Sequence, residues 1–334
     1  MKSIQKTTRM NLSEKTSPAK RQSRFFVWLG RIVVSIIGLA LAGAIYESVS
    51  ETADARTYPP TGQLVDVGGY RLHINCTGTG SPTVVIEAGL GDWSTSWGGV
   101  VQPEVAKTTR VCTYDRTGLG WSDASSLPSD AAQFAKELHT LLQNANVPGP
   151  YVMVGHSLGG FIVRIFAHDY ASEVAGVVLV DSMNPKQVTE ALSNKLALLS
   201  SMEAVLSRVG IGRLLVKLPA IASSAPPSGE AYYPLFVRPQ SLRTTSNEYR
   251  ALPASAAEAA AVKSFGDLPL IVLTAKLNDN PGWPEWQIDL LQLSSNSQHL
   301  FAENSGHVIQ FDEPDAAVNA IVKMVELVRQ PAEK

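Results

Sequence analysis

Cysteine is scarce in this chain, with two residues among 334, too few for the disulfide framework of a small secreted protein. The spacing of the two does not fit a zinc site, and we find neither a cluster of metal-ligating residues nor a phosphate-binding glycine loop. The sequence therefore predicts no metal and no cofactor. An excess of charge of one sign is lacking too. The formal net charge is −2, which gives no reason to expect a nucleic-acid partner.

The composition is that of a globular protein. Hydrophobic residues make up 45% of the chain and charged residues 17%, which allows a sizeable core. The length fits one large domain or two small ones. No internal repeat is visible, and nothing in the sequence indicates an oligomeric state.

The N-terminus combines a basic segment with a long apolar one. Residues 1–24 contain seven lysines and arginines against one acid, and residues 25–46 form a run of 22 residues that is long enough to cross a bilayer. Arg31 interrupts the run near one end, where its side chain can reach the lipid headgroups. The basic flank predicts a cytoplasmic N-terminus. We therefore expect a single-pass membrane anchor, with the rest of the chain in the periplasm or outside the cell.

The small residues at 40–44 leave a second interpretation open, a signal peptide that is cleaved to release a secreted protein. We favour the uncleaved anchor because the basic segment is long for a signal peptide. Residues 47–62, which include Pro59 and Pro60, are expected to be a linker.

From residue 63 onward, apolar runs with the spacing of strands alternate with segments of helical spacing. The first two strands are expected to form a hairpin joined at Gly68 and Gly69. Helices are predicted from Ser129, which can cap the first of them, to about Asn146, and from Pro314 onward. The predicted strands span residues 63–67, 70–76, 83–87, 110–114, 151–154, 175–180, 270–274 and 299–302. This order predicts an α/β fold in which a mostly parallel eight-stranded sheet is covered by helices on both faces.

Nearly ninety residues separate the strand that ends at Val180 from the one that begins at Leu270. A plain loop of that length would be unusual in a compact domain, and the segment is rich in leucine, valine, isoleucine and alanine. We expect residues 183–266 to form a helical cap over the strand ends. The core of the fold would then consist of residues 63–182 and 267–330.

The most informative motif is Gly-x-Ser-x-Gly at residues 155–159. An apolar run precedes it and a segment with helical apolar spacing follows it, which is the order strand, sharp turn and helix. A serine in such a turn has its hydroxyl pushed out of the sheet, and the flanking glycines avoid a collision between strand and helix. Ser157 is therefore the candidate nucleophile.

At four places, in the right order, the chain resembles the α/β-hydrolase superfamily, and the likeness covers roughly residues 63–330. The motif around Ser157 resembles the nucleophile elbow of that family. Residues 87–91 are similar to its oxyanion loop, although Ala88 stands where many members have histidine. Two further segments resemble the family's stretch after the fourth strand and the stretch that bears its catalytic histidine, namely residues 114–122 and 304–307. The resemblance implies the α/β-hydrolase fold but says little about the substrate.

The resemblance also implies a general base and an orienting acid for Ser157. His307 follows the last predicted strand in a glycine-containing loop, which matches the family order of serine, acid and histidine, so it is the expected base. Family members carry the acid either after the strand before the cap, where Asp181 stands, or after the strand that follows the cap, where Asp279 stands. We favour Asp181, with Asp279 as the alternative acid. His156 is expected to be packed or hydrogen-bonded and not to be the base.

Backbone amides complete the expected site. The N–H groups of Leu90 and Leu158 are the candidates for the oxyanion hole. Asp115 and Arg116 are expected to form an ion-paired turn that braces the active-site loops. The resemblance makes the strands of two cysteines neighbours, so an exported domain would allow a disulfide between them, with two buried thiols as the alternative. These cysteines are Cys76 and Cys112.

These residues predict a serine hydrolase that cleaves a carboxylic ester, or a related acyl bond, through an acyl-enzyme intermediate. The apolar cap predicts a small-molecule acyl substrate with an apolar portion. An epoxide hydrolase or dehalogenase is an alternative on the same fold, but those relatives use an aspartate where this chain has Ser157. A non-catalytic binding protein on this fold is the remaining alternative.

Overall fold

An eight-stranded sheet lies at the centre of the computed structural model, which describes residues 18–218 and 231–330, with side chains from residue 25 onward. The strand order is β1-β2-β4-β3-β5-β6-β7-β8. β2 pairs antiparallel with β1 and β4, and the other neighbouring strands are parallel. The strands are β1 (Gln63–Asp66), β2 (Arg71–Thr77), β3 (Thr83–Glu87), β4 (Val111–Tyr114), β5 (Tyr151–His156), β6 (Val174–Val180), β7 (Leu270–Ala275) and β8 (Ser297–Ala302). The predicted mostly parallel sheet of eight strands is confirmed.

Helices cover both faces of the sheet because successive side chains of each strand point to opposite sides. On one face, Val85 and Met153 belong to the same buried cluster as the apolar sides of α4 and α5. On the other face, Val84 and Val152 pack in a second cluster with α3 and α13. The helices of the core are α2 (Thr95–Gly98), α3 (Val101–Val105), α4 (Ala131–Asn144), α5 (Gly159–Asp169), α11 (Trp283–Leu290), α12 (Ile309–Asp312) and α13 (Pro314–Arg329). Three short 3-10 turns are η1 (Ala171–Glu173), η2 (Pro185–Gln187) and η3 (Leu291–Leu293).

Helix α4 begins at Ala131, and the capping residue is Asp130. Its side chain accepts a hydrogen bond from the backbone N–H of Gln133 (2.9 Å), which satisfies one of the free donors at the start of the helix. The prediction that Ser129 caps this helix is therefore wrong by one residue. The carboxylate next to the serine makes the bond instead, since its backbone already has the extended conformation of a cap.

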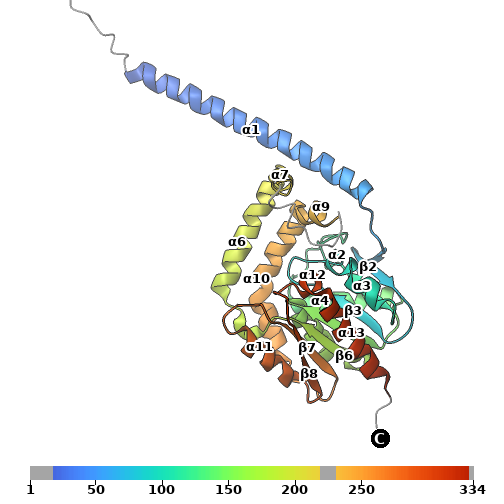
Figure 1. Ribbon diagram of the computed structural model, residues 1–334. Coiled ribbons are helices and arrows are strands. Elements are labelled where there is room, and N and C mark those ends of the chain that lie inside the picture. The colour runs from blue at the N-terminus through green and yellow to red at the C-terminus, as the bar shows by residue number, and fades with distance from the viewer. Residues whose placement is uncertain (1–17, 219–230, 331–334) are drawn as a thin grey trace, which may run out of the picture.

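The described residues between β6 and β7 contain four helices, which we call the cap helices. They lie together beside the sheet, with α6 and α10 running side by side (Figure 1). Small residues on α6, among them Ala197 and Ala204, are buried in this contact, and Ser246 Oγ donates to the carbonyl oxygen of Ala197 (2.8 Å). Small side chains let the two helices approach closely. The cap helices are α6 (Glu190–Ser207), α7 (Ile211–Leu215), α9 (Tyr232–Phe236) and α10 (Pro239–Ala261).

Helix α1 (Pro18–Thr57) precedes the sheet and extends well beyond the rest of the molecule (Figure 1). From Phe25 it is long and apolar enough to cross a membrane by length and composition, and its most apolar stretch is not buried against the rest of the protein. The segment expected to be a linker, residues 47–62, contains the end of α1, so the non-helical connection to β1 begins after Thr57.

Cys76 and Cys112 stand directly opposite each other on β2 and β4, and their sulfur atoms form a disulfide. Of the two alternatives that the sequence leaves open, the structure contains the bridge. The two residues are 36 positions apart, so the bond closes a loop that includes β3. It fastens the antiparallel edge of the sheet to the strand that leads into the parallel part.

Candidate active site

Ser157 lies in the sharp turn between β5 and α5, with its backbone in the left-handed region (φ 52°). This conformation is uncommon for a residue with a side chain and marks a strained turn. A Cβ on Gly155 would lie 2.6 Å from the carbonyl oxygen of Gly159, and a Cβ on Gly159 would lie 2.6 Å from that of Glu87. Only glycine fits at these two positions, so the motif allows the strand and the helix to approach as closely as they do.

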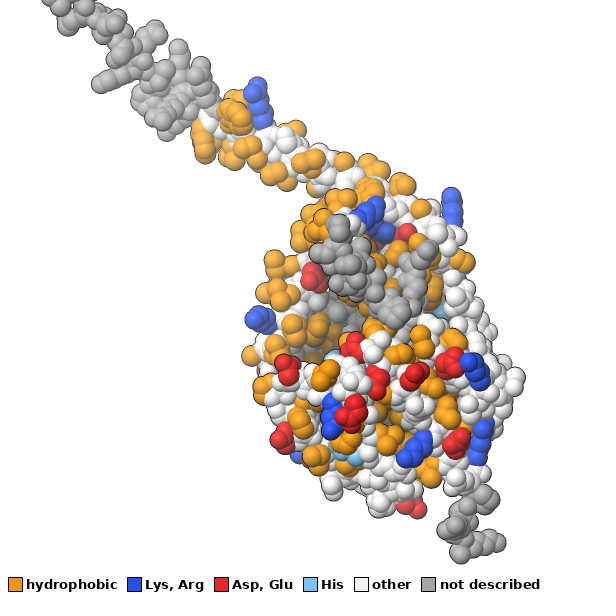
Figure 2. Space-filling model, in the orientation of Figure 1, with side chains coloured by type: hydrophobic (Ala, Val, Ile, Leu, Met, Phe, Trp, Pro, Cys, Tyr) orange, Lys and Arg blue, Asp and Glu red, His pale blue; other side chains and the backbone are white. Residues whose placement is uncertain are grey.

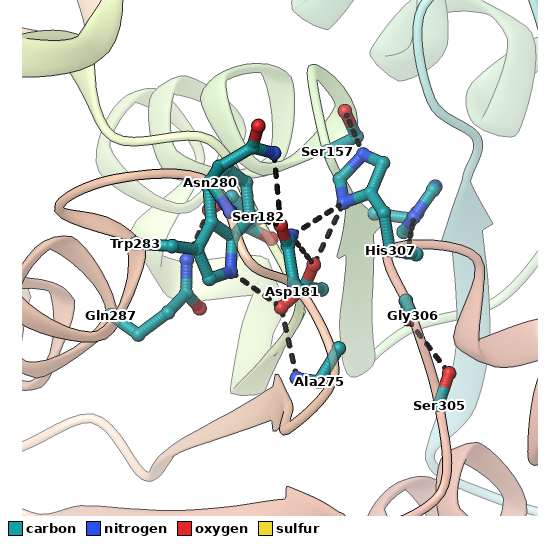
Figure 3. A network of polar contacts seen from close by, with 12 residues as sticks. Ser157, Asp181, Ser182, Ala275, Asn280, Trp283, Gln287, Ser305, Gly306 and His307 are labelled. Atoms are coloured by element: carbon teal, nitrogen blue, oxygen red, sulfur yellow. Dashed lines mark hydrogen bonds and ion pairs between the residues drawn. The ribbon is translucent and has the colours of Figure 1, made fainter.

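Ser157, His307 and Asp181 are joined in one chain of hydrogen bonds (Figure 3). Ser157 Oγ lies 3.1 Å from Nε2 of His307, and Nδ1 of the same ring lies 2.7 Å from Oδ2 of Asp181. The three residues follow β5, β8 and β6, so the carboxyl ends of three parallel strands bring them together. Ser157 is nine-tenths buried and Asp181 fully buried, whereas the imidazole is about one-third exposed. A nucleophile, a base and an orienting acid require this arrangement.

Asp181 receives hydrogen bonds on both carboxylate oxygens. Oδ1 accepts from the backbone N–H of Ala275 (2.9 Å) and from Nε1 of Trp283 (2.8 Å). Oδ2 accepts from Nδ2 of Asn278 (2.8 Å) in addition to its contact with His307. A fully buried carboxylate needs such partners. They also fix the direction in which the carboxylate faces the imidazole (Figure 3).

Asp279, the alternative acid, is exposed, and within the described part of the chain it makes no hydrogen bond with His307. Its neighbour Asn278 reaches the site instead. The amide nitrogen of Asn278 lies 2.8 Å from Asp181 Oδ2 and 3.5 Å from Nδ1 of His307. The loop after β7 therefore contributes a hydrogen-bond donor at this point, and the loop after β6 contributes the carboxylate.

His156 is buried beside the serine and supports the loop that bears His307. Its Nε2 lies 2.9 Å from the backbone carbonyl oxygen of His307, and the two rings are 4.9 Å apart. Burial, together with the neighbouring His307, lowers the pKa of His156 to about 3, so the ring is neutral near pH 7 and its Nε2–H donates the bond. The ring is packed and hydrogen-bonded, as expected from its place next to the serine. No sequence pattern predicts its bond to the carbonyl oxygen of His307, which is 151 positions away.

The backbone amides of Leu90 and Leu158 lie on the two loops that meet at Ser157. A Cβ on Gly89 would lie 2.9 Å from Nδ1 of His156 and 3.3 Å from Cβ of Ser157, so the loop after β3 passes directly against the serine turn. Neither amide donates a hydrogen bond to another described residue. The geometry thus leaves both N–H groups without an acceptor among the described residues.

Arg116 stabilises the loop after β3 through hydrogen bonds to its backbone. It is buried and donates to the carbonyl oxygens of Ala88 (2.8 Å) and Gly89 (2.5 Å). It also forms ion pairs with Glu87 (2.6 Å) and with Glu248 of α10 (2.8 Å). Burial raises the pKa of Glu87 to about 7 despite the opposing effect of Arg116. Glu248 was not foreseen, because its partner is 132 positions away in the chain.

Asp115 braces a different set of loops. It accepts hydrogen bonds from the backbone N–H groups of Ser94 (3.0 Å) and Trp121 (2.9 Å), and one of its oxygens lies 3.0 Å from Nδ1 of His73. Asp115 and Arg116 both brace loops, as expected. The expected ion pair between the two residues is wrong. The carboxylate of Asp115 and the guanidinium of Arg116 each have separate partners.

Two cavities meet at Ser157, and Leu90, Tyr249 and His307 line both of them. The first has a volume of about 710 Å³ and is rich in aromatic and polar side chains. The second has a volume of about 350 Å³ and lies against the cap helix α6. Its apolar side chains are Met183, Val188, Leu192, Leu196, Leu252 and Trp283. Two spaces of different character therefore adjoin the serine.

The described residues contain no group of three or more histidine, cysteine, aspartate or glutamate side chains that could hold a metal ion. The two acids that line the larger cavity are bound within the protein, since Asp92 contacts the hydroxyl of Ser96 and Asp312 accepts a hydrogen bond from the backbone N–H of Gly306 (3.0 Å).

Known proteins resemble the chain at the level of sequence and of fold. The family model described as alpha/beta hydrolase fold matches residues 82–204. An uncharacterized protein of Schizosaccharomyces pombe is 32% identical over 182 residues, which are 46% of this chain and 34% of that protein. The chain thus spans about a third of the length of this relative.

Two solved structures have the same arrangement of elements. They are the epoxide hydrolase CorEH and a thermophilic esterase from Thermogutta terrifontis. Each shares 20% sequence identity with this chain, covers 80% of it and 99% of its own length, and has a TM-score of 0.64. At this level of identity the likeness shows the shared fold and leaves the reaction to be argued from the site.

Proposed function

Since the chain has the α/β-hydrolase fold, we propose that it is a serine hydrolase that cleaves a carboxylic ester, or a related acyl bond, through an acyl-enzyme intermediate. The observation that carries the proposal is the unbroken chain of hydrogen bonds from Ser157 through His307 to Asp181. A serine hydroxyl is a weak nucleophile unless an adjacent base takes its proton. The imidazole lies within hydrogen-bond distance of that proton and is itself oriented by a buried carboxylate.

In the proposed mechanism, Ser157 Oγ attacks the carbonyl carbon of the ester while Nε2 of His307 takes the hydroxyl proton. Asp181 stabilises the imidazolium that forms. The amides of Leu90 and Leu158 donate to the oxyanion of the tetrahedral intermediate, and loss of one such donor typically costs about two to three decades in rate. The proton then passes from the imidazole to the departing alcohol. A water molecule, deprotonated by the same ring, releases the carboxylic acid and restores the serine.

The two cavities support a small-molecule substrate that extends to both sides of the scissile bond. The smaller cavity is lined largely by apolar side chains, which favours a hydrocarbon portion there because burial of apolar surface is favourable. The larger cavity contains the polar groups of Asp92, Tyr233 and Tyr249. We therefore propose an ester with one apolar portion.

The two other functions considered from the sequence have less support. An epoxide hydrolase or dehalogenase of the expected kind needs a carboxylate nucleophile, and Ser157 occupies that position. A non-catalytic binding protein has no need for Asp181 to be buried with donors on both oxygens and directed at an imidazole. Reaction with a serine-directed probe separates these alternatives from a serine hydrolase.

We propose further that α1 anchors the protein in a membrane, with the N-terminus in the cytoplasm and the catalytic domain on the other side. The exposed apolar helix from Phe25 and the basic segment before it support this orientation. The bridge between Cys76 and Cys112 is consistent with it, because disulfides persist in oxidising compartments. Intact-mass analysis of the mature protein tests the alternative, because a cleaved signal peptide would remove the segment before about residue 45.

The experiment that tests the hydrolase mechanism is covalent labelling by a fluorophosphonate probe. We expect the wild type to be labelled and Ser157→Ala to be unlabelled. Ser193→Ala is the matched control, since this serine lines the same cavity and is equally buried, and it should be labelled like the wild type. An unlabelled wild type, or equal labelling of Ser157→Ala, contradicts the proposed mechanism.

A further inference from the structure

The C-terminal half of α1 lies directly against the cap helices. A Cβ on Gly43 would collide with the backbone carbonyl of Val209, and one on Gly210 would lie 2.7 Å from the ring of Tyr46. Lys217 Nζ donates to Tyr46 Oη (3.1 Å). The junction between α6 and α7 is thus in backbone contact with α1 at a position that still belongs to its apolar run.

An ion-pair network holds this contact in one orientation. Arg213 of α7 donates from Nε to Glu47 (2.8 Å) and from Nη1 to Asp54. The side chains of Arg213 and Glu47 are both less than one-tenth exposed. Burial of charged groups is tolerated only when they are paired. The pairs occur just after the apolar run of α1, so the cap is fastened to α1 where the helix would leave a bilayer.

Helix α6 is apolar on the side that faces away from the protein, whereas the side packed against α10 consists of small serine and alanine residues. Its buried positions follow a helical spacing, from Ser193 through Ala197 and Ser200 to Ala204. The opposite side carries large apolar residues that are exposed, and more of them follow on and just after α7. We call this exposed set the cap face; its residues are Leu198, Leu199, Met202, Val205, Leu206, Leu214, Leu215 and Leu218.

The charged residues around the cap face are mainly basic. Lys195 lies on the same side of α6, and Arg208 and Lys217 lie near the junction with α7. Glu203 is the exposed acid at the edge of the face. Long basic side chains can rest on apolar surface while their charges stay among lipid headgroups. Large exposed apolar patches mark sites of contact with a membrane or with another protein.

The orientation of α6 relative to α1 decides what covers the cap face. In Figure 1, α6 runs crosswise to α1. The backbone of Val209, just after α6, lies against Gly43 of α1. If α1 crosses a bilayer, α6 therefore lies along the membrane surface at the level where the apolar run ends. Figure 2 shows hydrophobic side chains along α1 and again over the side of the body where α6 and α7 lie.

We propose that the cap face lies on the lipid bilayer beside α1, and that apolar esters dissolved in the bilayer reach Ser157 from there. The first part rests on α1 being an anchor, and the second part rests on the proposed hydrolase function. Helix α6 links the two, because its exposed side carries the cap face while Leu192 and Leu196 line the smaller cavity at Ser157. The substrate class is an ester with a long hydrocarbon chain that partitions into membranes.

A site-specific fluorescent label tests the contact with lipid. The described residues contain no free cysteine, and the sequence has two cysteines in all, so an introduced cysteine is the one labelled. Val205→Cys and Ile288→Cys, each carrying an NBD fluorophore, are compared in the full chain reconstituted into phosphatidylcholine vesicles. Val205 is 63% exposed on α6, and Ile288 is 52% exposed on α11. Both proteins contain α1, so a difference reports on the cap face.

We expect lipids with brominated acyl chains to quench the label at 205 strongly and the label at 288 weakly. Equal quenching at the two positions, or none at 205, overturns the proposal. A blue-shifted emission at 205 without quenching by brominated lipid indicates that protein covers this face, as in a dimer, and overturns it too.

A second measurement tests the route of the substrate. Val205→Glu should lower hydrolysis of 4-nitrophenyl palmitate dissolved in the vesicles roughly tenfold, about the factor expected when one valine is no longer buried in an apolar environment. It should leave hydrolysis of water-soluble 4-nitrophenyl acetate within about twofold, and Ile288→Glu should leave both unchanged. Equal loss on both esters overturns the proposed route. A wild type that hydrolyses neither ester contradicts the proposed function, whereas the quenching result still decides the contact with lipid.

Discussion

Glu248, on the cap helix α10, accepts a hydrogen bond from the backbone N–H of Gly91 in the loop after β3 (2.7 Å). Its other carboxylate oxygen accepts from Nε of Arg116 (2.8 Å), and Arg116 in turn donates to two carbonyl oxygens of the same loop. The loop that carries the amide of Leu90 is therefore held by the core and by the cap together. Residues distant from Ser157 thus fix the position of a proposed oxyanion donor.

Replacement of Glu248 by leucine should lower the free energy of unfolding by about 3 kcal/mol, because it leaves Arg116 buried with one partner fewer. It should also lower kcat more than it raises KM, since the amide of Leu90 acts on the transition state. Glu258→Leu is the matched control on the same helix, where the carboxylate accepts one backbone hydrogen bond and is partly exposed. A Glu248→Leu variant with lower stability and unchanged kcat would refute the positioning role.

Asp181→Asn should lower kcat by about four decades while the protein remains folded, because the amide no longer holds the imidazole in its productive tautomer. Asp279→Asn should stay within about twofold of the wild type, since that side chain is exposed. Steady-state kinetics on a soluble ester, with circular dichroism to verify folding, decide the matter. The reverse result would make Asp279 the acid.

Stability should fall as the pH is lowered from about 6.5 toward 3, in part because of His156. The unfolded state takes up a proton near pH 6.5, whereas burial keeps the pKa of the folded ring at about 3. The unfolded state therefore binds more protons in this window, and the contribution of His156 changes by up to about 1.4 kcal/mol per pH unit. It is fully present above pH 6.5 and is lost as the pH falls.

Urea denaturation between pH 7 and pH 4, compared with His156→Gln, isolates this contribution. The comparison is needed because burial raises the pKa of Glu87 to about 7 and that of Asp92 to about 6. Both carboxyls act in the opposite direction, since the folded state binds their protons more tightly. The wild type should lose more stability than His156→Gln on acidification, and parallel curves would rule out a buried neutral ring.

Removal of the disulfide should destabilise the protein by about 4 kcal/mol, the loop-closure value for a separation of 36 residues. The double variant of Cys76 and Cys112 to serine tests this by chemical denaturation. Labelling by the fluorophosphonate probe should persist in the variant at low temperature, because the bridge lies away from Ser157. Alkylation of two thiols in the untreated wild type would show that the bridge does not form.

The order of strands and helices could be predicted from the sequence because period-2 and period-3.6 apolar patterns are local. The motif at residues 155–159 likewise carries its own geometry, since only glycine fits on either side of Ser157. The loops of His307 and Asp181 could be placed near Ser157 because the resemblance to the α/β-hydrolase superfamily implies it. Which aspartate faces the imidazole depends on how the loop after β7 turns, and no local pattern encodes that.

Ion pairs between residues far apart in the chain could not be predicted from local sequence patterns. Arg116 finds Glu248 across 132 positions, and Arg213 finds Glu47 across 166. Each of these residues taken alone reads as an ordinary surface charge, and only the packed cap makes them partners. The end of α1 is a similar case, since Glu47 and Asp54 lie in the segment expected to be a linker and their partner Arg213 lies on α7.

The ion pairs between Arg213 and α1 have a consequence for how the proposed hydrolase would meet its substrate. An anchor on a flexible tether would let the catalytic domain tumble and sample the water above the membrane. In the proposed arrangement, the ion pairs of Arg213 with Glu47 and Asp54 fasten the cap helices to the anchor and keep Ser157 at one height above the membrane and at one tilt. In the proposed arrangement, encounters then depend on the number of substrate molecules per unit area of membrane and on their lateral diffusion. The concentration in the surrounding water would matter little.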